Sequence, residues 1–223
     1  DTVKSVLGQG YPNLEYIVMD GGSTDGSVDI IAQHAPRLAH HTSGPDGGQS
    51  AAIAAGLARA SCGPDDVMAY LNSDDLYMPG ALRFVAEYMA RHPEIDAVYG
   101  HRVIIDETGL ETGRWFTHRH NATITLRVDL VPQETLFWRK RIYDKVQGID
   151  PAFRFAMDWD LITRFISAGA RMVRLPWFLG AFRVHSTSKT STLWESVGAV
   201  EADRIRVARH GRPLSQTEVL APW

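Results

Sequence analysis

Hydrophobic and polar positions follow a repeated strand and helix pattern over the first 91 residues. The apolar, β-branched run 15–20 predicts a buried strand that ends in a Gly-rich turn, and apolar positions at helical spacing predict a helix over 27–34. The same order returns twice, with strands expected over 38–43 and 67–71 and helices over 49–60 and 81–91. Strands that alternate with helices in this way favour a mostly parallel sheet with helices on both faces.

The pattern is less regular in the second half of the chain. Further strands are expected over 96–106, 134–138 and 171–175, and helices over 141–146, 158–168 and 193–210. The stretch 111–130 has no clear period and is interpreted as a connection that partly covers a site, while residues 2–9 resemble the end of a helix. Without an internal repeat or a low-complexity linker, residues 1–223 are expected to form a single α/β domain.

Composition narrows the classes of partner and compartment. The chain has 23 Lys and Arg against 26 Asp and Glu, and its longest basic run is the triplet 139–141, so we expect no nucleic-acid partner. Cys62 is the only cysteine, which excludes a disulfide framework within the chain and a Cys-based metal site and favours a reducing compartment. Because no run approaches about 18 apolar residues and the first residues do not resemble a signal peptide, a cytoplasmic location is expected.

Acidic or Gly-rich turns follow three of the predicted strands. They are Asp20-Gly21-Gly22, Asp46-Gly47-Gly48 and Asn72-Ser73-Asp74-Asp75. Each carboxylate alone is also explained as a helix cap or a solvated turn residue. The carboxyl ends of parallel strands meet at one edge of a sheet, however, so three such turns favour a shared ligand site. Adjacent carboxylates such as Asp74 and Asp75 repel each other, and a bound Mg²⁺ or Mn²⁺ would relieve that repulsion and could bridge a pyrophosphate.

Several motifs in a fixed order make the chain resemble a known family. These are residues 5–26, 45–50 (PDGGQS), 71–75 (LNSDD), 133–139 (QETLFWR), 148–153 (GIDPAF) and 157–161 (MDWDL). Over about residues 5–189 the chain resembles the family 2 inverting glycosyltransferases. The resemblance implies the GT-A fold, a Rossmann-like, three-layer arrangement with a nucleotide-binding sheet between helices. It also implies a nucleotide-donor half at 1–106 and an acceptor half with a C-terminal helix at 107–223.

The resemblance assigns donor-binding roles to several side chains. Asp20 looks like the family residue that contacts the nucleotide base, and Ser23 and the turn with Asp46, Gln49 and Ser50 complete the nucleoside pocket.

It also implies a divalent cation, Mg²⁺ or Mn²⁺, as cofactor. Asp74 and Asp75 match the DXD-type motif, whose carboxylates contact the ribose and the metal that holds the diphosphate. His185 resembles a late family segment near the diphosphate and could add a metal or phosphate contact, although an ordinary surface histidine is an equal interpretation.

Asp158 lies where the family places its general base. An acceptor hydroxyl has a pKa far above 7 and needs a base within hydrogen-bond reach, and one in-line displacement gives inversion at the anomeric carbon. Asp160 competes for this role, but two positions apart on a helix the side chains point about 160° apart, so only one of them faces the acceptor. We expect Asp158 to be the base. For either residue, the alternative is an acid favoured at a helix N-terminus.

Other candidates have ordinary explanations as well. Gln133 and Glu134 line either the donor or the acceptor side, or only begin a strand. Five aromatic residues could stack on sugars, although most are expected in the core, with one or two at most touching ligand. These are Trp115, Phe116, Trp138, Trp159 and Trp177. His118 and His120 lack the spacing of ligands and are expected in a loop.

The chain departs from the family pattern in three places. Gly21 stands where many members have a second aspartate, and Asn72 stands at the first position of the DXD-type motif, which weakens the expected base and ribose contacts. The chain also starts beyond the family's first strand, which forms one wall of the nucleotide pocket. We therefore expect an open sheet edge that faces solvent or pairs with another chain.

The sequence thus predicts an enzyme that moves a sugar, with inversion, from a nucleotide-diphospho donor to a saccharide or lipid-linked acceptor. A UDP- or dTDP-linked donor and a role in polysaccharide or cell-envelope biosynthesis are expected. A lipid-linked acceptor would place the protein peripherally at the inner face of the plasma membrane. The alternative is a non-catalytic module that binds nucleotide-sugars or glycans. A phosphoryl-transfer enzyme is disfavoured because no P-loop lysine or nucleophile pattern follows the acidic loops.

Overall fold

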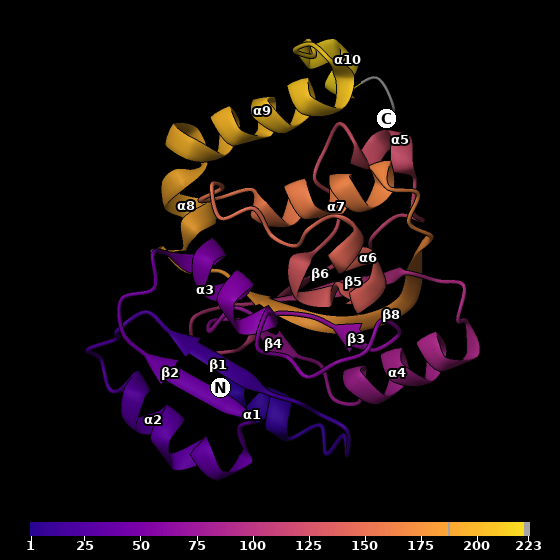
Figure 1. The fold of residues 1–223 in the computed structure, drawn as a ribbon. Helices are drawn as coiled ribbons and strands as arrows, with labels where there is room; N and C mark the ends of the chain where they lie inside the picture. The colour runs from indigo at the N-terminus through magenta and orange to yellow at the C-terminus, as the bar shows by residue number, and fades with distance from the viewer. Residues whose placement is uncertain (187, 221–223) are drawn as a thin grey trace.

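Two sheets lie between layers of helices in the computed structural model, which describes residues 1–186 and 188–220 (Figure 1). β1 (Ile17–Asp20) and β2 (His40–Ser43) form a parallel pair. The order in the second sheet is β3 (Val67–Met68), β7 (Phe137–Arg139), β5 (Ala97–Ile105), β8 (Met172–Arg183) and β4 (Leu76–Tyr77), and β6 (Glu111–Trp115) pairs with β5.

The helices confirm most of the predicted ones. They are α1 (Thr2–Leu7), α2 (Ser27–His34), α3 (Gln49–Leu57), α4 (Ala81–Arg91), α5 (Ala122–Thr125), α6 (Lys140–Lys145), α7 (Met157–Ser167), α8 (Lys189–Leu193), α9 (Ala199–His210) and α10 (Gln216–Leu220). The helix expected over 193–210 is divided, because a π-helical turn over Trp194–Gly198 separates α8 from α9.

The larger sheet is mixed, which corrects the expectation of a mostly parallel one. Only β5 and β8 are parallel in it, whereas β3–β7, β5–β7, β5–β6 and β4–β8 are antiparallel. A hairpin whose turn includes Gly109 (φ 90°) leads from β5 directly into β6. The pattern of hydrophobic positions did not predict β6 because this strand is short and polar. β4, with two residues, was also not predicted.

Two predicted strands change their extent for identifiable reasons. The run 67–71 is a strand only at Val67 and Met68, because farther along the Tyr70 carbonyl accepts from the side-chain amide of Gln133 instead of a neighbouring strand (2.7 Å). β8 continues well past Leu175, because its register against β5 shifts around Pro176 and thereby accommodates a residue without an N–H.

Alternation along the central strands produces a hydrophobic core on each face of the sheet. Ala97 and Trp138 pack in the core beneath α7 and α9, whereas their neighbours Val98 and Phe137 pack in the core with α1 and α4. Figure 1 shows α7 and α9 above the larger sheet and α4 below it. The expectation of helices on both faces is confirmed, because side chains at successive strand positions point to opposite sides.

The two sheets do not join through a strand in the described residues. β1 has β2 as its hydrogen-bonded neighbour and β3 has β7, and among the described residues no strand pairs with the other edge of either. A large cavity extends between these two edges. Among the helices described, none has the length and apolar character needed to cross a bilayer.

Candidate functional site

One cavity of about 1740 Å³ brings the predicted site residues together. Its wall includes the end of β1, the loop before α3, the loop between β3 and β4, the start of α7 and the segment after β8. The predicted residues that line it are Asp20, Ser23, Asp46, Gln49, Asp74, Asp75, Asp158 and His185. Ser50 differs, because it is buried and its hydroxyl donates to the Phe153 carbonyl next to the sulfur of Met157.

Asp20 closes the turn that follows β1. Its carboxylate accepts hydrogen bonds from the Ser23 hydroxyl and N–H (2.5 and 3.0 Å), the Gly22 N–H (3.1 Å) and the Ser43 hydroxyl (2.5 Å). These bonds, those from Ser23 and Ser43 above all, lower the pKa of Asp20 to about 2. The carboxylate is therefore ionised at neutral pH, and it lies at the rim of the cavity.

Gly21 and Asp46 meet where the turns after β1 and β2 approach each other. A Cβ atom on residue 21 would lie 3.0 Å from Oδ2 of Asp46. The Asp46 carboxylate in turn accepts from the Gly48 N–H (2.8 Å), within a turn where Gly47 and Gly48 have positive φ. An aspartate in place of Gly21 would press a second negative charge against Asp46, so this departure from the family pattern has a local steric and electrostatic cause.

The acidic loop over 72–75 is held by both halves of the chain. The Asn72 side chain accepts from the Gln49 amide (2.6 Å) and donates to Gln133 (3.1 Å). From α1, the Thr2 hydroxyl donates to the carbonyls of Ser73 and Asp75 (2.6 and 2.8 Å). These contacts fix the direction in which the two carboxylates leave the loop.

Asp75 is a buried carboxyl group with an altered pKa. Its side chain is 1% exposed, and Oδ1 accepts from the Arg183 N–H (3.0 Å). Burial, together with the charges of Glu134 and Asp74, raises the pKa of Asp75 to about 8. A buried carboxyl that lacks a full positive partner is the kind of group that a divalent cation stabilises in its ionised form.

Asp74 and His185 form a pair at the cavity wall, with Oδ2 and Nε2 3.0 Å apart. In the described part of the chain, no three His, Cys, Asp or Glu side chains converge in a geometry that would hold a metal unaided. The predicted ligands Asp74, Asp75 and His185 therefore do not make a closed protein site. Mg²⁺ commonly binds through one or two carboxylates plus substrate phosphates, and two adjacent carboxylates at a cavity wall fit that donor set.

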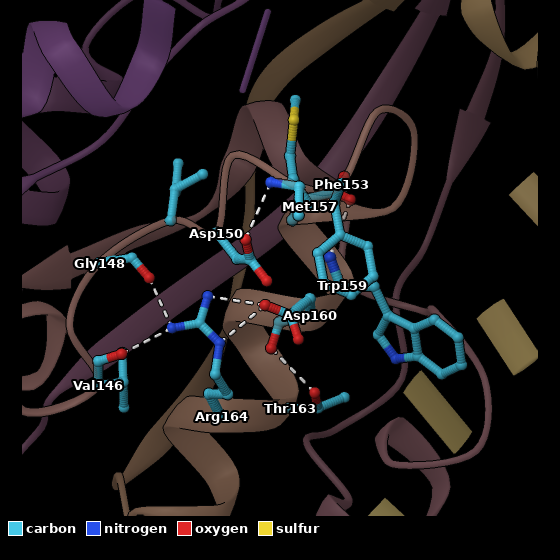
Figure 2. Close-up of polar contacts among 12 residues, drawn as sticks. Val146, Gly148, Asp150, Phe153, Met157, Trp159, Asp160, Thr163 and Arg164 are labelled. Atoms are coloured by element: carbon cyan, nitrogen blue, oxygen red, sulfur yellow. Dashed lines mark hydrogen bonds and ion pairs between the residues drawn. The ribbon is translucent and has the colours of Figure 1, made fainter. Parts of the chain in front are cut away.

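α7 separates the two candidate bases. Asp158, in the first turn of α7, lines the cavity, and its Oδ1 accepts from the Trp159 N–H (2.8 Å). Burial raises its pKa. Asp160 is buried away from the cavity and pairs with Arg164 (2.7 Å), as Figure 2 shows. Arg164 also donates to the carbonyls of Val146 and Gly148, so Asp160 anchors the loop before α7.

The motif analysis missed two charged residues on the cavity wall, Arg102 and Asp129. Arg102 on β5 makes a two-pronged ion pair with Glu134 (2.7 and 2.5 Å), and its guanidinium lies over the rings of Trp115 and Phe182. The available signal was an arginine directly before the apolar run 103–105. Asp129 lies in the aperiodic stretch after α5, where no pattern indicated it.

The remaining candidates divide between cavity, core and surface. Trp115 and Trp159 line the cavity, and Trp138 is completely buried in the core. Phe116 and Trp177 are 63% and 52% exposed, and neither lines the cavity. His118 and His120 lie between β6 and α5, away from the cavity wall. Gln133 and Glu134 line it from a 3₁₀ turn (Gln133–Thr135), where the strand had been expected to begin.

Solved structures with a similar fold include a mannosyltransferase and a protein in complex with UDP. Staphylococcus aureus TarS in complex with UDP superposes with a TM-score of 0.63 at 16% identity, covering 93% of this chain and 65% of that one. Mannosyltransferase PcManGT from Pyrobaculum calidifontis, in complex with GDP-Man and Mn²⁺, gives a TM-score of 0.65 at 17% identity, covering 99% of this chain and 64% of that one. The likeness shows that the chain has the GT-A fold.

Sequence comparison identifies the family. An uncharacterised glycosyltransferase of Nostoc sp. is 26% identical over 216 residues, which is 90% of this chain and 65% of the relative. An uncharacterised glycosyltransferase of Mycobacterium tuberculosis is 30% identical over 168 residues, covering 73% of this chain and 62% of the relative. The chain thus spans somewhat less than two thirds of these relatives. The model of glycosyl transferase family 2 matches residues 1–174, and the chain therefore belongs to that family.

Proposed function

We propose that this chain carries the nucleotide-sugar site and the catalytic base of an inverting glycosyltransferase. The supporting observation is that Asp158 lines the same cavity as Asp20, Asp74 and Asp75, although the chain supplies them from distant segments. Residues 1–106 would form the donor half and residues 107–223 the acceptor half. Family membership supports glycosyl transfer in general, and the residue roles that follow are part of the proposal.

The donor would lie across the carboxyl ends of β1 and β2. The Asp20 carboxylate accepts hydrogen bonds and is ionised, so it suits the N–H groups of a nucleotide base, with Ser23, Asp46 and Gln49 around it. Ser50 would support this wall from beneath, because its hydroxyl is engaged with Phe153. TarS was solved with UDP and PcManGT with GDP-Man, which supports a nucleotide-diphospho donor for this chain without deciding between bases.

The leaving diphosphate would be met by the acidic loop. Asp74 and Asp75 would hold a Mg²⁺ or Mn²⁺ ion, with His185 beside Asp74, and the ion would supply positive charge to the diphosphate. PcManGT and GalNAc-T7 were solved with Mn²⁺, which supports this cofactor.

The transfer itself would be a single displacement. The acceptor oxygen forms a bond to the anomeric carbon as the bond from that carbon to the diphosphate oxygen breaks, and the hydroxyl proton passes to Asp158. Asp158 is half-buried at the cavity wall, where an acceptor bound in the cavity would meet it. Its raised pKa makes it a stronger base than an exposed aspartate. The acceptor would be a saccharide or a lipid-linked saccharide, and only the latter would bring the protein to a membrane surface.

Calorimetric titration and turnover assays test this proposal. UDP, GDP and dTDP are titrated with and without Mn²⁺ into the wild type and into Asp75→Ala, and a panel of their sugars is assayed with alkyl glycosides. Tighter diphosphate binding with Mn²⁺, lost in Asp75→Ala, supports the donor site. Asp158→Asn should keep UDP binding and lose transfer. Wild-type binding without any turnover would instead favour the non-catalytic module.

A further inference from the structure

The loop that leads into α7 is held by a carboxylate from α9. Glu201 accepts hydrogen bonds from three successive backbone N–H groups, those of Arg154 (2.7 Å), Phe155 (2.9 Å) and Ala156 (2.8 Å). Glu201 is 8% exposed, so water hardly competes for these bonds. Hydrogen bonds to an ionised carboxylate are about twice as strong as bonds between neutral groups. Glu201 is therefore a firm connection between the two helices.

α7 has no capping side chain of its own. Its N-cap residue is Ala156, whose methyl group accepts no hydrogen bond. The N–H groups at the start of a helix lack partners within the helix, and a negative charge is favourable there because the helix dipole is positive at that end. Glu201 supplies from another helix the acceptor that a local Ser or Asp usually provides. Asp158 follows Ala156 by only two positions.

The carbonyl groups of the same loop have separate partners. The Phe153 carbonyl accepts from the Ser50 hydroxyl, and the Arg154 carbonyl accepts from Nζ of Lys189 (2.9 Å). These two bonds connect the loop to α3 and α8, on the donor side of the cavity, and neither involves Glu201. A substitution at Glu201 should therefore leave the wall that faces the donor in place.

α7 is also anchored independently of Glu201. Met157 and Trp159, on either side of Asp158, are buried in the core, as is Leu161 farther along the helix. Loss of the Glu201 carboxylate should therefore shift the first turn of α7 without unfolding the helix. A displacement of about 1 Å at a reacting group is enough to lower a rate about a hundredfold.

We propose that Glu201 is a positioning residue for Asp158: it fixes the peptide groups before α7 and thereby the direction in which the Asp158 carboxylate meets an acceptor hydroxyl. This inference rests on the proposed function. It adds a residue that lies outside the family match over residues 1–174. Glu201 does not line the cavity and is expected to touch neither substrate.

Turnover and binding assays test the role with the donor and acceptor that the panel selects. Glu201→Gln keeps the shape of the side chain but replaces one acceptor oxygen with an amide that donates. We expect kcat to fall about tenfold to a hundredfold, while the Kd of UDP with Mn²⁺ stays within about twofold of the wild type. Asp203→Asn is the matched control, because it removes a negative charge from an exposed pair on the same helix and should transfer as the wild type does. A comparable loss of UDP affinity in Glu201→Gln would overturn the proposal.

A double-mutant cycle separates the positioning of Asp158 from a general role in the fold. In the Asp158→Asn background, Glu201→Gln should change the residual transfer rate by less than about twofold, because the group that Glu201 positions is already absent. If Glu201→Gln lowers the rate as much in that background as in the wild type, it acts on the fold as a whole and the proposal is wrong.

Carboxyl NMR distinguishes a failure of this inference from a failure of the proposed function. The ¹³C carboxyl signal of Asp158 should move in Glu201→Gln and stay in place in Asp203→Asn, whether or not the protein transfers a sugar. An unmoved signal in Glu201→Gln would contradict the positioning role. A wild type that shows the expected shifts but transfers no sugar would count against the proposed function and not against the action of Glu201 on Asp158.

Discussion

The imidazole Nε2 of His185 lies 3.0 Å from Oδ2 of Asp74, although the two residues are 111 positions apart. Arg183, at the end of β8, reinforces this connection: its Nε donates to the Asp74 carbonyl and its N–H to the Asp75 carboxylate, both at 3.0 Å. The end of β8 therefore holds the acidic loop in place. A substitution at the end of β8 should therefore change the affinity for a ligand that binds at the acidic loop.

Replacement of His185 tests that connection. In His185→Ala, Asp74 loses the contact that orients it, and UDP affinity in the presence of Mn²⁺ should fall roughly threefold to tenfold, the size of one hydrogen bond. Calorimetry of wild type and variant measures the change. His92→Ala, at an exposed pair with Glu94, is the matched control and should bind as the wild type does. Unchanged affinity in His185→Ala would show that Asp74 needs no such support.

The two aspartates of α7 should give opposite phenotypes. Asp158→Asn removes the proposed base and should lower kcat by roughly 10² to 10⁴ with little change in thermal stability. Asp160→Asn leaves Arg164 and Arg209 without their acid, and it should cost about 3 kcal/mol of unfolding free energy while the folded fraction keeps its activity. Urea unfolding and turnover per folded molecule separate the two, and the reverse assignment would refute Asp158 as base.

The pKa of Asp75 predicts how stability depends on pH. Because this pKa is raised to about 8, the folded chain between pH 5 and 7 retains a proton that an unfolded aspartate, with its ordinary pKa of 3.8, has released. The contribution of Asp75 to unfolding free energy should therefore fall as pH rises, by at most about 1.4 kcal/mol per pH unit. Asp75→Asn should flatten this part of the curve, measured by urea unfolding without divalent cations. If unfolding free energy depends on pH in the same way in the wild type and in Asp75→Asn, Asp75 is ionised over the whole range and the prediction is wrong.

The Arg102–Glu134 pair should matter more than its exposed counterpart. Glu134 is 1% exposed, so Arg102→Met leaves a buried charge without a partner and should cost about 3–5 kcal/mol. Arg114→Met breaks the exposed pair with Glu111, which solvent screens, and should cost far less unfolding free energy than Arg102→Met. Chemical denaturation compares them, and the double variant with Glu134→Gln should recover part of the loss. Similar costs for Arg102→Met and Arg114→Met would show that burial adds nothing here.

The sequence by itself determined the features that depend on neighbouring residues. The run 15–20 with its Gly-rich turn, and the helices over 27–34 and 81–91, follow from local periodicity and turn chemistry, and the structure confirms them. Local order also indicated candidate site residues, since Asp20 ends β1, Asp46 lies in the loop after β2, and Asp74 and Asp75 lie in the loop between β3 and β4. The motif order over the whole chain was enough to indicate the family, which the comparison with known families confirms.

Only the tertiary structure decided the features that depend on long-range packing. Strand direction is such a feature, because β5 pairs antiparallel with β6 and β7 and no local sequence pattern specifies that direction. The contacts of individual side chains are a second such feature. Ser50 donates to the Phe153 carbonyl, and Asp160 pairs with Arg164, whereas Asp158 lines the cavity. Burial and charge at such positions arise from the whole fold, which short-range sequence patterns do not specify.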